Sequence, residues 1–211
     1  MNEVLKEVHK FGGTSIANAD RIQHISTLIP DSCVIVVSAM AGVTKLLIDS
    51  LTSAINQDDW SSLLDDVFVF HENVVDDLLP TPLRKDLMLS IREDFEKVKT
   101  IVQGVAWMKT YSPAQYAEVI SFGELCSARI ISSYLETISS ATWVDAKDFL
   151  VIDEGHDILT CDWSVSGGFW KEKQYADTYN YLVVTGFRAR CNKGFITTLG
   201  LNGSDISASF V

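Results

Sequence analysis

Two short glycine-containing segments carry the residue types that phosphoryl transfer needs. The first is Lys10-Phe11-Gly12-Gly13-Thr14-Ser15, and the second is Thr198-Leu199-Gly200-Leu201-Asn202-Gly203-Ser204-Asp205. Both follow apolar runs, and glycine lets backbone N–H groups approach an anion closely. Lys10 adds a cation that can offset the charge of a transferring phosphoryl group. Together the two segments predict a site that handles phosphate.

A third segment has the composition of a binding loop for a small polar molecule. Residues 38–44 follow the apolar run 33–37 and contain two hydroxyl side chains, Ser38 and Thr44, with a glycine between them. Taken alone, this segment favours an ordinary connection from a strand to a helix over a binding loop. The same holds for a lone lysine beside a glycine turn, so only the combination of segments indicates a kinase-type site.

Glu124 is a candidate for binding a substrate ammonium group. It follows Gly123 inside a stretch with helical periodicity, where glycine costs about 1 kcal/mol relative to alanine. Such a glycine indicates the close approach of another backbone or of a ligand. The alternative interpretation is a solvated helix glutamate, which is the commoner situation for this residue type.

The first 56 residues predict the elements that would position these segments. Residues 8–11 and 33–37 are apolar runs typical of strands, and the second is rich in β-branched residues, as in a strand covered on both faces. A helix is predicted between them over 18–29, and another over 45–56. This arrangement is a βαβ unit with parallel strands, whose carboxyl ends form a usual place for a ligand.

The remaining chain predicts a helical region followed by further strands. The residue pair Ser112-Pro113, with Gln115 after it, has the form of a capping box. Helices are expected over 61–79, 83–109 and 113–138, and strands over 142–145, 181–185 and 195–199. Residues 153–179 carry no clear pattern. We expect one domain over 1–211, with a helical stretch at about 61–138.

Composition limits the classes of protein to which the chain can belong. It has 211 residues, 47% of them hydrophobic, and a formal net charge of -11. The acidic balance argues against nucleic acid as a partner, and the chain has no run of 18 apolar residues that would indicate a membrane span. Its start lacks the pattern of a signal peptide, so a cytoplasmic location is expected. The four cysteines are not closely spaced and are expected to be reduced, mostly buried thiols.

Taken jointly, the motifs resemble aspartate kinase, a member of the amino acid kinase family. The resemblance extends from about residue 8 to the end of the chain. It implies an α/β fold, a three-layer sandwich with a mainly parallel central sheet and a helical lobe. It also implies ATP-dependent phosphorylation of L-aspartate to 4-phospho-L-aspartate, the first step toward lysine, threonine and methionine. The motifs that carry it are segments 10–15, 37–44, 121–124, 185–187 and 197–205.

The same resemblance implies roles for individual residues. Lys10, with Phe11, Gly12 and Gly13, would bind the transferring phosphoryl group of ATP, and Asp205 would hold the lysine in position. Mg²⁺ would be held mainly by the nucleotide phosphates and water. No metal-binding side chain is assigned. The residues expected to contact aspartate are Ser38, Thr44, Glu124, Phe187, Leu201, Gly203 and Ser204.

Two departures from the family pattern stand out. Leu201 occupies the position of a family arginine that pairs with a substrate carboxylate, a role that leucine cannot fill. Arg188 and Arg190 are candidate replacements, although a surface role is favoured for each. The chain also stops soon after Asp205, so we expect it to be the N-terminal portion of a catalytic domain. We expect this portion to be inactive alone and to self-associate. Two alternatives are a non-catalytic binding module and an amino acid kinase acting on another carboxylate.

Overall fold

A parallel four-stranded sheet forms the centre of the computed structural model, which describes residues 7–153, 160–173, 178–200 and 203–211. The strands lie in the order β1-β2-β6-β3, and each neighbouring pair is parallel. The predicted strand at 33–37 is confirmed, and it pairs with strands on both sides. The bounds are β1 (Glu7–Phe11), β2 (Cys33–Val37), β6 (Tyr181–Thr185) and β3 (Ala141–Val144).

The continuous apolar run of β2 contributes side chains to two hydrophobic clusters. All five residues of the strand are buried. Cys33, Ile35 and Val37 belong to a large cluster under the helices, whereas Val34 and Val36 belong to a smaller cluster on the other face. Because successive side chains of a strand point to opposite faces, a strand that is covered on both faces needs apolar residues at every position.

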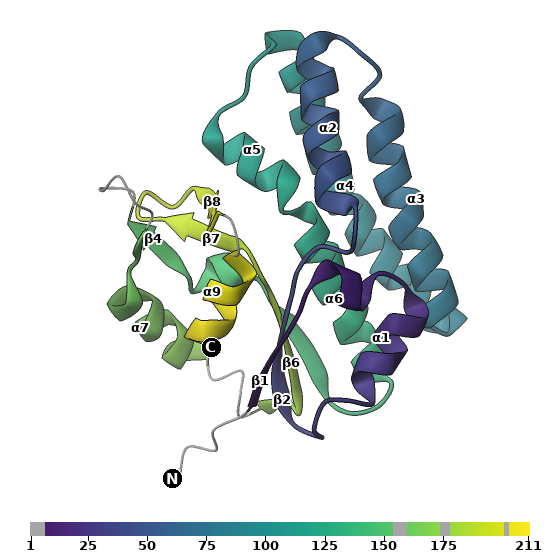
Figure 1. Cartoon of the computed structure of the whole chain (residues 1–211), viewed down its shortest axis with the longest axis vertical. Helices are drawn as coiled ribbons and strands as arrows, with labels where there is room; N and C mark the ends of the chain where they lie inside the picture. Colours follow the sequence, from purple (N-terminus) through teal and green to yellow (C-terminus); the bar gives the residue numbers. More distant parts are fainter. Residues whose placement is uncertain (1–6, 154–159, 174–177, 201–202) are drawn as a thin grey trace.

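Helices cover one face of this sheet and extend beyond it as a lobe (Figure 1). Helix α6 contacts β2, β3 and β6, while α2, α3 and α4 pack against one another farther from the sheet. No helix of the described residues combines the length and apolar character needed to cross a membrane. The helices on this side are α1 (Ala19–Ser26), α2 (Val43–Asn56), α3 (Ser61–Leu78), α4 (Thr81–Met108), α5 (Pro113–Ile120) and α6 (Phe122–Glu136).

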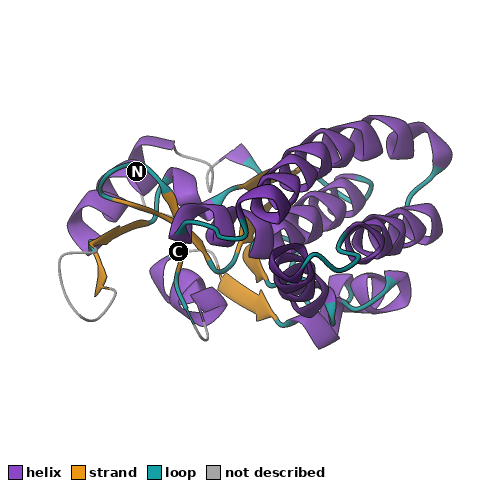
Figure 2. Ribbon diagram, turned by 90° about the horizontal axis from the view of Figure 1, so that it is seen from above, coloured by secondary structure: helices purple, strands orange, loops and turns teal. Residues whose placement is uncertain are grey.

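A second, mixed sheet and two helices lie on the other side (Figures 1 and 2). Its strand order is β5-β4-β7-β8, with only the β4–β7 pair parallel. The rings of Phe149, Trp170 and Phe210 contact one another here and bring the C-terminal helix onto the smaller cluster. The elements are β4 (Val151–Asp153), β5 (Thr160–Cys161), α7 (Trp163–Lys173), β7 (Arg188–Cys191), β8 (Ile196–Thr198) and α9 (Gly203–Phe210).

These parts make the three-layer α/β arrangement with a mainly parallel central sheet that the sequence predicts. The capping box of Ser112 and Gln115 is also confirmed, since the Ser112 side chain accepts from Gln115 N–H and the Gln115 side chain accepts from Ser112 N–H. Of the four cysteines, Cys33, Cys126 and Cys191 are buried.

The prediction of a single helix over 113–138 is wrong. The chain forms two helices there, and Ser121, with φ -94° and ψ 4°, separates them. The Ser121 hydroxyl donates to the carbonyl oxygen of Ala117 at 2.6 Å. The carbonyl oxygen of Ser121 accepts from the guanidinium of Arg188 at 3.3 Å. A contact from a residue 67 positions away therefore holds the break, and local periodicity carries no signal for it.

Candidate functional site

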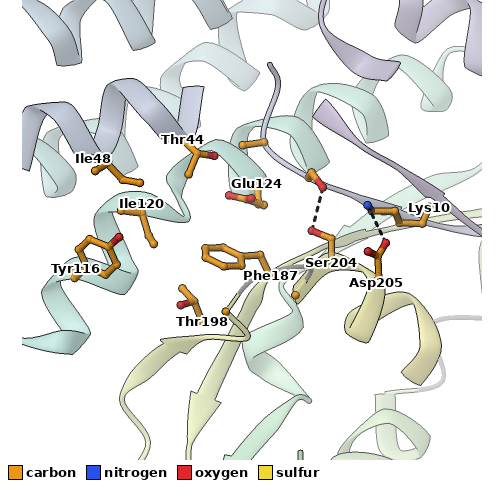
Figure 3. A pocket seen from close by; sticks show the side chains of 14 residues that line it. Lys10, Thr44, Ile48, Tyr116, Ile120, Glu124, Phe187, Thr198, Ser204 and Asp205 are labelled. Carbon is orange, nitrogen blue, oxygen red and sulfur yellow. Dashed lines mark hydrogen bonds and ion pairs between the residues drawn. The ribbon is translucent and has the colours of Figure 1, made fainter. Parts of the chain in front are cut away.

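A cavity of about 520 Å³ opens at the carboxyl ends of β1 and β2 (Figure 3). It lies between α2, α5 and α6 of the helical lobe and the region from β6 to α9 that carries Phe187 and Ser204. Segments from both ends of the chain therefore meet in one place, as the sequence predicts for the ends of parallel strands. Predicted site residues that line it are Lys10, Ser38, Thr44, Glu124, Phe187, Gly203, Ser204 and Asp205.

Three of the other predicted residues stand outside the lining. Phe11, Gly12 and Gly13 lie at the end of β1 and in the 3₁₀ turn that follows it (Gly13–Ile16). A Cβ added to Gly12 would lie 4.0 Å from Lys10 Nζ, so a larger side chain there would compete for space beside the ammonium group. Leu201 lies outside the described residues.

Lys10 and Asp205 form an ion pair at one end of the cavity. Their Nζ and Oδ1 atoms are 2.9 Å apart, and the Asp205 side chain is 58% exposed. Asp205 lies in the first turn of α9, close to Ser204, whose hydroxyl accepts a hydrogen bond from Ser38 at 3.0 Å. The helix begins at Gly203, so Ser204 and Asp205 are helical residues.

Two loops interlock beside this ion pair. The backbone N–H of Ser38 donates to the Phe11 carbonyl oxygen, and the N–H of Ala41 donates to the Gly13 carbonyl oxygen, both at 3.2 Å. A Cβ on Gly13 would lie 2.4 Å from the carbonyl oxygen of Ala39. Only glycine allows this approach, so the glycine turn after β1 is fixed against the loop after β2.

Glu124 is a buried carboxylic acid at the other end of the cavity. It is 4% exposed, and its Oε2 has no hydrogen-bond partner within the described part of the chain. Burial raises the pKa of Glu124 to about 7, while the Ala39 N–H and, more weakly, Arg188 act in the opposite direction. The solvated-glutamate interpretation is therefore wrong. A buried carboxylate with an unpaired oxygen facing a cavity is suited to bind a cationic group.

Gly123 explains how Glu124 reaches this position. A Cβ at residue 123 would lie 2.6 Å from the Ala39 Cβ and 2.8 Å from the Val43 Cγ1. The absence of a side chain therefore lets the first turn of α6 contact the loop after β2. The predicted close approach at this glycine is confirmed, and it brings Glu124 near Thr44.

Phe187 has a left-handed backbone and lines the same cavity. Its φ is +67°, which is uncommon for a residue other than glycine and typical of functional turns. The preceding residue, Gly186, leaves room for Ser204, because a Cβ there would lie 2.4 Å from the Ser204 hydroxyl oxygen. The backbone turn after β6 thus places the aromatic ring and the Ser204 hydroxyl side by side (Figure 3).

Sequence reasoning missed an apolar and aromatic part of the lining. Ile48, Tyr116 and Ile120 all border the cavity. Thr44 and Ile48 are four residues apart on α2, as are Tyr116 and Ile120 on α5. Residues at that spacing share one helix face, so the position of Thr44 was a usable signal for Ile48. Nothing local to α5 indicates that its face borders a ligand cavity.

The expected surface role of Arg188 is wrong. Arg188 is 1% exposed, and its Nε donates to both carboxylate oxygens of Asp145, at 2.9 and 3.1 Å. It does not line the cavity. Arg190 is partly buried, and its guanidinium lies 4.3 Å from the ring centre of Phe169. Neither guanidinium therefore reaches into the cavity to replace the arginine expected at position 201.

Comparison with known proteins matches almost the whole chain. The amino acid kinase family profile matches residues 6–211. The bifunctional aspartokinase/homoserine dehydrogenase 1 of Arabidopsis thaliana, a chloroplastic protein, is 27% identical over 217 residues. That alignment covers 97% of this chain and 23% of the relative, so the chain spans about a quarter of the length of that protein.

Solved structures show the same fold. The structure of E. coli aspartokinase III in complex with lysine and aspartate matches with a TM-score of 0.84 at 24% identity, covering 97% of this chain and 46% of the other. The structure of the same enzyme with aspartate and ADP matches with a TM-score of 0.82 at 24% identity, covering 98% and 46%. The chain thus spans about half of each of these structures.

Proposed function

Because the chain belongs to the amino acid kinase family, we propose that it forms the amino-acid-binding part of an aspartokinase. The proposed reaction is the phosphorylation of the side-chain carboxylate of L-aspartate to give 4-phospho-L-aspartate. The observation that carries this proposal is a cavity with a buried, incompletely paired carboxylate at one end and a lysine held by an aspartate at the other. The aspartokinase names of the relatives support it.

In this proposal Glu124 binds the ammonium group of aspartate. An ammonium ion supplies hydrogen-bond donors to the unpaired Oε2 and a charge that favours the ionised carboxylate. Ser38 and Thr44, which line the cavity beside Glu124, supply hydroxyl groups for the polar atoms of the substrate. The ring of Phe187 closes the apolar side of the site and excludes water from it.

Lys10 acts at the other end in this proposal. The carboxylate oxygen of aspartate is already a nucleophile at neutral pH, so alignment and charge neutralisation matter more than a general base. Asp205 holds the lysine ammonium group in place before substrate binds. ATP would supply the phosphoryl group, with Mg²⁺ held mainly through its phosphates and water. Lys10 and the glycine turn at Gly12 and Gly13 are the residues of this chain that would contact that group.

Calorimetric titration of L-aspartate tests the proposal directly. The wild-type chain is expected to bind L-aspartate and to bind succinate, which lacks the ammonium group, far more weakly. Equal affinity for the two compounds would remove Glu124 from the amino-acid site. If neither L-aspartate nor succinate binds, the result contradicts the assignment of an aspartate site to this chain.

A further inference from the structure

A buried arginine joins two walls of the cavity without lining it. Arg188 begins β7, and its Nη1 donates to the Ser121 hydroxyl at 2.7 Å and to the Ser121 carbonyl oxygen at 3.3 Å. Its Nε donates to the carboxylate of Asp145, the residue that follows β3. One guanidinium thus ties the second sheet to the parallel sheet and to the junction of α5 and α6.

The two points that Arg188 connects carry side chains of the cavity. Phe187 precedes it directly, and the N–H of Leu199 donates to the Phe187 carbonyl oxygen at 2.9 Å. Ser121 lies three residues before Glu124, at the break that separates α5 from α6. A displacement of Arg188 would therefore change the position of Phe187 relative to Glu124, although Arg188 itself does not line the cavity.

The charge of Arg188 is only partly compensated. Asp145 also accepts from Thr185 at 3.2 Å and lies 3.5 Å from Lys147 Nζ. Arg188 Nη2 has no hydrogen-bond partner within the described residues and stands 4.0 Å from Glu118 Oε1. The guanidinium lowers the pKa of Glu124 against the larger effect of burial. Other titratable groups near Glu124 are Cys126 on its own helix and, around the cavity, Lys10, Tyr116 and Asp205.

Building on the proposed amino-acid site, we propose that Arg188 is a positioning residue that fixes Phe187 and Glu124 across the cavity. Arg188 is a buried cation that holds the break between two helices and does not itself line the cavity. Such a cation stabilises one geometry of the site. The binding of an amino acid is therefore expected to depend on Arg188 without direct contact.

The test compares three variants of the whole chain. Arg188→Met combined with Asp145→Asn removes the guanidinium together with the carboxylate that it neutralises, so neither member of this ion pair is left as an unpaired buried charge. Ser121→Ala keeps that ion pair and removes only the hydroxyl link to the helix junction. Arg190→Met is the matched control, because Arg190 lies on the same strand but its guanidinium contacts the ring of Phe169.

Two measurements separate positioning from simple destabilisation. A carbon-13 NMR titration of the Glu124 carboxyl in the ligand-free chain is expected to show a higher pKa in the double variant than in the wild type. L-aspartate affinity is expected to fall at least about tenfold near pH 7 and by less at higher pH, where Glu124 is ionised in both chains. Ser121→Ala should show a smaller change in the same direction, and Arg190→Met none.

Each contrary result has a distinct meaning. A folded double variant with the wild-type Glu124 titration and aspartate affinity would overturn the proposal for Arg188. Should that variant fail to fold, an unchanged Ser121→Ala chain would overturn it instead. A wild-type chain that binds no L-aspartate would contradict the proposed function, whereas the Glu124 titration in the ligand-free protein would still decide the role of Arg188.

Discussion

At one end of the cavity, Lys10 Nζ and Asp205 Oδ1 lie 2.9 Å apart, and both side chains reach solvent. At the other end Glu124 is buried, and its Oε2 has no hydrogen-bond partner among the described residues. The first end has its charges already paired within the protein. At the second end, none of the described residues places a counter-charge in contact with Glu124 Oε2. The difference indicates that Lys10 is preorganised before substrate arrives, while Glu124 depends on the substrate for its partner.

The largest effect is expected from breaking the preorganised end. Lys10→Met should lower turnover by about 10²–10³-fold in a protein that carries the complete catalytic domain, because a cation aimed at developing charge is lost. Steady-state kinetics measures this effect. Lys45→Met is the control, since Lys45 is an exposed lysine paired with Asp49 on α2. Equal turnover of the two variants would assign Lys10 to the surface.

A large effect on binding is expected at the buried end. Glu124→Gln should weaken L-aspartate binding by about 2–5 kcal/mol, because a buried partner of the substrate charge is removed. Calorimetry measures the affinity, and the Michaelis constant for ATP should change far less in the complete enzyme. Glu136→Gln, an exposed glutamate on the same helix, should leave aspartate affinity unaltered. If both variants bind normally, Glu124 has no part in the site.

A smaller gain is expected from restoring the arginine of the family pattern. Leu201→Arg should increase L-aspartate affinity by about tenfold to a hundredfold, because a charge-assisted pair with a substrate carboxylate is worth about 1.5–3 kcal/mol. Parallel titrations of the two chains measure it. Tight binding by both would mean that another cation already fills this role, and binding by neither would favour a different substrate or a non-catalytic module.

The smallest effect is a proton released on binding. The pKa of Glu124 is raised to about 7 in the empty cavity, and a bound ammonium group lowers it again. Binding at pH 7 should therefore release about half a proton, and less at higher pH, where Glu124 is already ionised. Calorimetry in buffers of different ionisation enthalpy counts the proton. The Glu124→Gln chain, measured at higher ligand concentration, should release none from this residue.

The parts of the fold that sequence predicts are those with a strong local pattern. The run at 33–37 has an apolar residue at every position because both faces of β2 are covered, and a glycine turn follows β1 because Ala39 approaches Gly13. Gly123 likewise indicated a close contact from local sequence alone. These signals depend on the residue itself and its immediate neighbours.

The features that were missed depend on distant partners. Strands β4 and β7 are three and four residues long, too short for a visible periodicity, and 34 residues separate the end of β4 from the start of β7. Arginine is a residue type that is mostly exposed, and the contacts with Asp145 and Ser121 make the burial of Arg188 favourable. The break at Ser121 has the same origin. Local sequence therefore predicts the site residues more readily than the contacts that position them.

The order of strands in the parallel sheet has a consequence for how the chain acquires its structure during synthesis. β1 and β2 are joined by a short crossover, but β3 lies beside β6 and has no pairing with β2. β3 must therefore wait for residues 181–185 before it joins the sheet. The helices at 43–136 are complete well before that point, and contacts over long sequence separations form slowly. The cavity needs Ser204 and Asp205, so it can form only after those residues have been synthesised, later than the helices at 43–136.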